Sequence, residues 1–162
     1  RDPGLRFVVP MAGAKQRAYF GEIVAHSGLG GVDLQLVDDS HTAIAAADAV
    51  LVASGTATLE VALFKKPMVI AYKVMRASWE LMRHMGYQPW IGLPNILARE
   101  FLVPELLQHA MTPEAMADAV WRQLNDTALR DKLAARFTQM HHSLLRDSAR
   151  ESAEAVLRVI GK

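Results

Sequence analysis

The sequence predicts an α/β domain in which a parallel sheet lies between two layers of helices. Short apolar runs of strand length alternate with longer segments whose apolar residues recur at helical spacing. Hydrophobic residues make up 51% of the 162 residues, which is enough for a sizeable core and suits one domain. Strand–helix alternation at this pitch requires right-handed crossovers, which join parallel strands. We therefore expect residues 1–162 to form a single domain, with the sheet region at about 5–110 and further helices at about 112–160.

Four apolar runs rich in Val, Leu and Ile are too short to form helices. They lie at residues 5–11, 32–37, 49–53 and 68–72. Runs of this kind are typical of strands that are buried on both faces of a parallel sheet. Pro10 falls near the end of the first run, where a missing N–H group costs least. The sequence therefore predicts four parallel strands.

Segments with apolar residues at helical spacing lie between and after these strands. Helices are expected at residues 13–27, 40–47, 56–64, 75–87, 113–124, 127–144 and 148–160. In the first of these helices, Tyr19 and Ile23 are expected to face the core. Ser40, Thr112 and Ser148 are the expected N-caps, because their hydroxyl groups can accept a hydrogen bond from a first-turn N–H group.

One strand–turn–helix stretch, residues 50–63, organises the rest of the chain. Its strand breaks at Ser54, Gly55 and Thr56, and in parallel sheets ligands lie beyond such carboxyl ends. The first N–H groups of the helix that begins here, including that of Ala57, have no partner within the helix. The helix dipole also places partial positive charge at this end, so the turn can hold a phosphate. Glu60, one turn further along, can accept hydrogen bonds from two neighbouring ribose hydroxyls. The alternative is that the turn only caps a helix and Glu60 lies on a solvated face.

Two further segments carry one functional and one structural interpretation each. Pro94 restrains the backbone before Asn95, whose amide suits a sugar hydroxyl or a diphosphate oxygen, or else serves a turn. In the helix at 75–87, Trp79, Met82 and Met85 recur at near-helical spacing among arginines. This helix is either a surface that touches lipid or a core-facing stripe with solvated arginines.

Composition excludes several classes of function. The chain has no cysteine, which rules out disulfides, thiolate metal sites and cysteine nucleophiles. The net charge of +1 gives no overall attraction to nucleic acid, and no apolar run approaches the roughly 20 residues of a membrane span. The six histidines show no ligand spacing with carboxylates. We therefore expect no metal, no cofactor and no nucleic-acid partner.

Four ordered segments resemble the lipid-A-disaccharide synthases, a family of bacterial glycosyltransferases. The resemblance runs over nearly the whole chain, and the segments lie at residues 53–60 (ASGTATLE), 67–73 (PMVIAYK), 93–97 (LPNIL) and 103–108 (VPELLQ). One local departure follows Leu97, where the family usually has a glycine and this chain has Ala98. The departure concerns the loop conformation beyond Asn95.

The resemblance implies a Rossmann-like three-layer fold, namely the C-terminal half of a GT-B glycosyltransferase with extra C-terminal helices. In that family the N-terminal half binds the acceptor and carries the catalytic base. We expect that half to be absent here, together with the Gly-Ser-Arg loop that starts the C-terminal half. No catalytic residue is therefore expected in this chain, and the chain alone is expected to be inactive.

The resemblance also implies the substrates. The family transfers 2,3-diacylglucosamine from UDP to 2,3-diacylglucosamine 1-phosphate, which gives lipid A disaccharide 1-phosphate and UDP. It further implies a cytoplasmic enzyme at the inner membrane of a bacterium, with peripheral membrane contact and a homodimer as further expectations. The residues expected to bind the UDP-sugar are Ser54, Gly55, Thr56, Ala57, Glu60, Asn95 and Tyr72, with Lys73 as a weaker candidate.

Two other functions fit the same architecture. A UDP-N-acetylglucosamine 2-epimerase-like half also grips UDP at a comparable turn, although the segment at residues 93–95 argues against it. A non-enzymatic nucleotide-binding module is the third candidate. An isomerised sugar nucleotide formed without an acceptor would identify the epimerase. A tight protein partner without nucleotide contact would identify the module.

Overall fold

The computed structural model describes residues 4–28, 31–75, 78–80 and 89–161. The strands among these residues are β1 (Arg6–Pro10), β2 (Asp33–Val37), β3 (Val50–Ala53), β4 (Met68–Tyr72) and β5 (Glu105–Leu107). The helices are α1 (Ala14–His26), α2 (Ser40–Ala46), α3 (Thr56–Leu63), α5 (Leu93–Ala98), η1 (Gln108–Ala110), α6 (Pro113–Asn125), α7 (Thr127–Leu144) and α8 (Ser148–Val159). The four predicted strands are confirmed.

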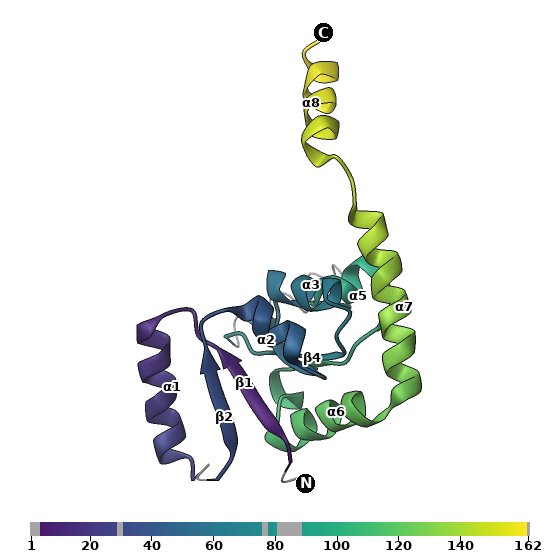
Figure 1. Cartoon of the computed structure of the whole chain (residues 1–162). Coiled ribbons are helices and arrows are strands. Elements are labelled where there is room, and N and C mark those ends of the chain that lie inside the picture. The colour runs from purple at the N-terminus through teal and green to yellow at the C-terminus, as the bar shows by residue number, and fades with distance from the viewer. Residues whose placement is uncertain (1–3, 29–30, 76–77, 81–88, 162) are drawn as a thin grey trace.

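The strands are parallel, as predicted, but they form two sheets. In one sheet β1 pairs with β2, and in the other β4 lies between β3 and β5. Figure 1 shows α2 carrying the chain from the first sheet to the second. The sequence pattern predicts parallel crossovers without specifying which strands become neighbours, and this is why it did not reveal the division.

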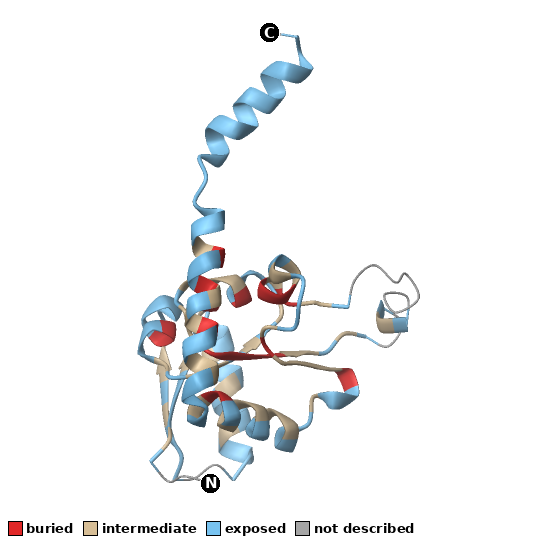
Figure 2. Cartoon of the chain, turned by 90° about the vertical axis from the view of Figure 1, so that its right-hand side faces the viewer, coloured by how far each residue is buried: buried red, intermediate tan, exposed pale blue. Residues whose placement is uncertain are grey.

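The core surrounds β4, whose Met68, Val69 and Ile70 are completely buried. In Figure 1, α3 and α5 lie above β4 and α6 lies below it, which gives the three layers that the sequence predicts. Leu133 and Phe137 of α7 pack into the same cluster, and Figure 2 shows buried residues on β4 and along the inner side of α7. The central strand of this sheet is therefore held rigidly from both faces.

Three expected N-caps have mixed outcomes. Thr112 caps α6 as predicted, since its hydroxyl accepts a hydrogen bond from the N–H of Ala115. The predictions for Ser40 and Ser148 were wrong, because the preceding residues, Asp39 and Asp147, cap α2 and α8 instead. An N-cap lies just outside the first helical turn, and both serines are already the first helical residue.

Other expectations about the elements also need correction. Tyr19 and Ile23 of α1 were expected to be buried, but 67% and 46% of their surfaces are exposed, because α1 lies beside a sheet of two strands only. Strand β5 was not predicted from local sequence, and residues 93–98 form the helix α5 where a tight segment and turn were expected. Most of the predicted helix at 75–87 lies outside the described residues, although residues 78–80 are helical.

The last helix, α8, extends away from the domain (Figures 1 and 2). No residue of α8 is buried. Its apolar residues Val156, Leu157 and Val159 are 59%, 45% and 87% exposed, and Ile160, its C-cap, is 60% exposed. Over the described part of the chain, no helix combines the length and the apolar character that a membrane crossing needs.

Candidate functional site

Strand register brings the candidate residues to one edge of the three-stranded sheet. Ala53 at the end of β3 is paired with Ala71, and Tyr72 at the end of β4 is paired with Leu107. The residues that follow β3, β4 and β5 are Ser54, Lys73 and Gln108, so all three lie beyond the carboxyl edge. This is the edge at which open α/β sheets bind ligands.

The turn between β3 and α3 is open. Gly55 precedes the helix with φ +145°, a conformation that favours glycine, and it has no side chain with which to cap α3. Apart from its chain neighbours, no atom of the described residues lies within 4 Å of the point where a Cβ of Gly55 would stand. Thr56 and Ala57 are exposed, and their N–H groups have no acceptor within the helix.

Ser54 lies half-buried at the same turn. Its Oγ donates a hydrogen bond to the carbonyl oxygen of Ile91 over 3.3 Å. A serine hydroxyl has one proton, so in this arrangement Ser54 ties the turn to the segment before α5 and presents only its lone pairs elsewhere. The N–H groups at the start of α3, which have no acceptor within the helix, are the donors that the turn offers, rather than this hydroxyl.

Glu60 lies on the flank of α3 that faces α2. Its Oε2 is 3.6 Å from Nε2 of His41, and 41% of its side chain is exposed, so it is half-open to solvent. His41 also contacts the ring of Phe64. The N-cap Asp39 fixes the start of α2, and hydrogen bonds from Thr42, the hydroxyl first, hold the pKa of this carboxyl below its usual value. The carboxylate of Glu60 is therefore accessible and lies beside the imidazole ring of His41.

Asn95 belongs to α5, a helix that packs against α3, and it is completely buried. Its Nδ2 donates to the carbonyl of Val103 and to Oε1 of Glu105, and its Oδ1 accepts from the N–H groups of Leu102 and Val103. Four hydrogen bonds use the full capacity of an asparagine amide. Asn95 is thus not brought together with Glu60, and its amide is engaged within the protein.

Tyr72 and Lys73 lie at the carboxyl end of β4, where Tyr72 is half-buried and Lys73 is exposed. Beside them, Gln108 has a left-handed backbone with φ +51°, which is uncommon for a residue other than glycine. Sequence reasoning missed both Gln108 and Glu105. Both fall in the segment at 103–108 that carries the family resemblance, which was the available signal, but without a predicted β5 they had no position in the sheet.

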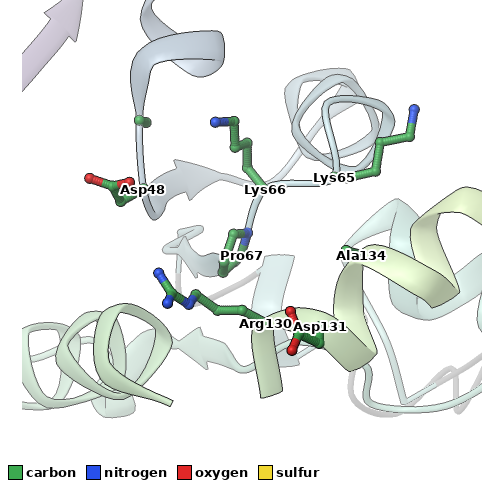
Figure 3. Close-up of a pocket in the computed structure, with 8 residues that line it drawn as sticks. Asp48, Lys65, Lys66, Pro67, Arg130, Asp131 and Ala134 are labelled. Carbon is green, nitrogen blue, oxygen red and sulfur yellow. The ribbon is translucent and has the colours of Figure 1, made fainter. Parts of the chain in front are cut away.

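A shallow pocket lies at the opposite edge of the sheet, where β3 and β4 begin. Its lining residues are Ala47, Asp48, Lys65, Lys66, Pro67, Arg130, Asp131 and Ala134. Figure 3 shows the side chains of Asp48, Lys66 and Arg130 extending to the same side, with Lys65 directed away from them. Charges of both signs alternate here, so the pocket lacks the one-sided anion preference of the turn at Gly55.

The described residues contain no group of three or more His, Cys, Asp or Glu side chains that could hold a metal ion. What the carboxyl edge offers is a set of fixed dipoles, namely N–H groups without a side-chain cap at a positive helix end, with a carboxylate one turn away. This arrangement can bind an anionic group and an adjacent pair of hydroxyls without a metal ligand set.

Comparisons with known proteins agree with the resemblance in the sequence. A family model described as Lipid-A-disaccharide synthetase matches residues 1–160. Curated proteins named lipid-A-disaccharide synthase are 54% identical in Burkholderia lata, 52% in Paraburkholderia phymatum and 53% in Burkholderia vietnamiensis, each over 162 residues. Each match covers 99% of this chain and 41% of the relative, so the chain spans about two fifths of the length of these relatives.

Proposed function

The chain belongs to the lipid-A-disaccharide synthetase family, and from that premise we propose that it is the UDP-sugar-binding half of an inverting glycosyltransferase. The observation that carries the proposal is the open turn at residues 54–57, where α3 begins without a side-chain cap at the carboxyl end of β3. A diphosphate is the part of the donor that such a turn suits.

In the proposed complex, the diphosphate of UDP accepts hydrogen bonds from the amides of Gly55, Thr56 and Ala57. When the bond between the sugar C1 and the diphosphate oxygen breaks, negative charge develops on UDP. Amides that already point at this position stabilise the charge without having to reorganise, and such stabilisation often contributes more to catalysis than any other effect. The turn therefore supports the leaving group and needs no general acid of its own.

Glu60 holds the ribose in this proposal. Its carboxylate accepts hydrogen bonds from the 2′ and 3′ hydroxyls, and its place one turn into α3 suits the distance from diphosphate to ribose. Its contact with His41 keeps the carboxylate on the α2 flank of α3. Tyr72, at the neighbouring strand end, forms part of the pocket wall.

Asn95 supports the same site through contacts within the protein. Its amide is engaged by residues 102–105, and these contacts favour a role in holding the segment that carries Ile91 over a direct contact with sugar or phosphate. In this proposal Asn95 supports the pocket and does not touch the ligand.

The whole protein, in this proposal, transfers 2,3-diacylglucosamine from UDP to 2,3-diacylglucosamine 1-phosphate. An acceptor hydroxyl oxygen bonds to C1 on the face opposite the departing UDP, and a base takes the hydroxyl proton. We place the acceptor site and that base in a second half of the protein, because the chain spans 41% of its relatives. The products are lipid A disaccharide 1-phosphate and UDP.

The lipid substrates imply work at the cytoplasmic face of a bacterial inner membrane, with peripheral contact. The exposed apolar residues of α8 are a surface for either the other half of the protein or a second copy in a homodimer. Whether the segment at 75–87 meets the membrane stays a prediction from sequence.

Calorimetry with UDP tests the donor site. Charge-assisted hydrogen bonds contribute about 1.5–3 kcal/mol each, and the partial exposure of Glu60 lowers this, so Glu60→Ala should weaken binding about tenfold. Glu114→Ala, which removes an exposed carboxylate from α6, is the matched control and should bind as the unmutated chain does. Equal affinity in the Glu60 variant would remove this residue from the site.

A transferase assay of the same chain tests the division of labour. Without a catalytic base the chain should form no disaccharide from the two lipid substrates. Turnover by these 162 residues alone would refute the assignment of the base to another part of the protein.

A further inference from the structure

The carboxylate of Glu105 is the meeting point of three hydrogen bonds. Oε2 accepts from the N–H of Ile91 over 2.9 Å, and Oε1 accepts from the N–H of Gly92 over 2.9 Å and from Nδ2 of Asn95 over 2.8 Å. Glu105 is the first residue of β5 and is paired with Ile70 of β4. Two successive backbone amides that converge on one carboxylate form charge-assisted bonds, which are shorter and stronger than neutral ones.

The segment that Glu105 holds lies directly on the sheet. A Cβ placed on Gly92 would be 2.2 Å from Cδ1 of Ile70 and 3.2 Å from Oε1 of Glu105, so only glycine allows this approach. Asn95 closes the other side through its bonds to Leu102 and Val103. The backbone at residues 91–92 therefore has one position, and the carboxylate defines it.

One residue connects this cluster to the open turn. Ile91 donates its N–H to Glu105 and accepts with its carbonyl from Oγ of Ser54. Ser54 is the first residue after β3 and adjoins Gly55. The carbonyl of Ile91 and the N–H of Gly92 belong to one peptide group, which accepts from Ser54 and donates to Oε1 of Glu105. Hydrogen bonds on the two sides of one peptide group polarise one another, so the charge on Glu105 strengthens the hold on Ser54.

We propose that Glu105 is a positioning residue for the donor turn: through Ile91 it orients Ser54 and thereby the amides of residues 55–57. The inference rests on the proposed function for its ligand, although the chain of contacts exists without a ligand. Glu105 itself touches neither sugar nor phosphate. A carboxylate on β5 thus acts on the geometry of an anion site after β3 through the peptide group between Ile91 and Gly92, in addition to the pairing of both strands with β4.

The test compares Glu105→Gln with Glu100→Gln in the 162-residue chain by amide NMR. Gln keeps the shape but replaces one acceptor oxygen with an NH₂ group, which faces an N–H donor. Glu100, whose carboxylate pairs with Arg136 on the surface, is the matched control. In the ligand-free chain the Glu105 variant should shift the amide resonances of Gly55, Thr56 and Ala57 as well as those of residues 91–92. The Glu100 variant should leave all of them in place.

UDP binding separates positioning from general stability. The Glu105 variant should raise the Kd for UDP about tenfold, as expected when the loss of a charged partner displaces the donors. In a double-mutant cycle, Ser54→Ala should remove most of that effect, because both residues act through Ile91. A purely structural role would give additive losses in the cycle.

The proposal is overturned if residues 91–92 respond to Glu105→Gln while the resonances of residues 55–57 do not move. If the Glu105 variant fails to fold, Ser54→Ala tests the same chain of hydrogen bonds, because it removes the bond from Ser54 to the carbonyl of Ile91. Ser54→Ala must then shift the amide resonance of Ile91. If this resonance does not move, the proposal is equally overturned. Absence of UDP binding by the unmutated chain would refute the proposed function. The ligand-free comparison would still decide the role of Glu105.

Discussion

Gly92→Ala tests the close approach on which the candidate site depends. The added Cβ would stand 2.2 Å from Cδ1 of Ile70, against an ordinary carbon–carbon separation of about 3.5–4.0 Å. Ile70 is completely buried within the core around β4, so its side chain is confined by its neighbours. Overpacking of this kind costs about 1–3 kcal/mol, and we expect a value near the upper end, about 2–3 kcal/mol.

Urea unfolding of the chain measures this cost, and thermal unfolding should show a midpoint lower by about 5–10 °C. The matched control is Gly21→Ala on α1, where an added Cβ would have no described atom within 4 Å apart from its chain neighbours and the backbone of α1. This change should leave stability equal or raise it by up to about 1 kcal/mol, because glycine is unfavourable inside a helix.

A second substitution identifies the clash. Ile70→Val removes Cδ1, the atom at 2.2 Å, and leaves Cγ1 at 3.6 Å, an ordinary contact. Ile70→Val alone should cost about 0.5–1.5 kcal/mol. The double variant should therefore be more stable than Gly92→Ala alone, with a coupling of about 2 kcal/mol. Full stability of Gly92→Ala, or strictly additive losses, would refute the reasoning.

Three further predictions concern the core, α2 and α8. Phe137→Ala should lower the free energy of unfolding by about 3–5 kcal/mol in urea titrations because this ring is completely buried, whereas Phe101→Ala, at a position 62% exposed, should change it little. The lowered pKa of Asp39 means that its cap stabilises α2 above the usual carboxyl pKa, and that this contribution is lost as the pH falls through the lowered value; acid titration by circular dichroism should show a smaller loss in Asp39→Asn, and an equal loss would contradict this. Leu157→Ser on α8 should leave the free energy of unfolding unchanged, since α8 is exposed. The same change should weaken self-association, or association with the other half of the protein, in sedimentation experiments. A lower unfolding midpoint would contradict the absence of buried contacts on α8.

The strands that were predictable are those with apolar residues in unbroken succession, although only β4 has consecutive buried residues and Leu51 of β3 is 49% exposed. β3 and β4 are apolar over their whole length, and β4 has the predicted bounds. β5 has three residues and begins with Glu105, which local pattern assigns to a loop. Its place comes from pairing with Ile70 and from the hydrogen bonds of the Glu105 carboxylate, and both are long-range.

Cap residues show the same division. Where a serine and an aspartate stand side by side before a helix, composition alone does not say which is the cap. The backbone decides in favour of Asp39 and Asp147, which lie one residue before their helices. Thr112 was predictable because Pro113 marks the first helical position.

The candidate site divides in a similar way. The turn at residues 54–57 is local, so the sequence located it, and the structure adds that it is open. The support of the turn is not local. Ile91, Asn95 and Glu105 meet across three segments, and only the folded chain reveals that the Asn95 amide is engaged internally. The exposure of Glu60 likewise depends on how α2 and α3 pack.

The central claim is that the turn before α3 binds the diphosphate of UDP while Glu60 binds its ribose. A crystal structure of the chain with UDP tests this most directly. We predict diphosphate oxygens within hydrogen-bonding distance of the amides of residues 55–57 and ribose hydroxyls at the Glu60 carboxylate. UDP bound instead at the opposite edge, beside Lys66 and Arg130, with the turn unoccupied, would contradict the account.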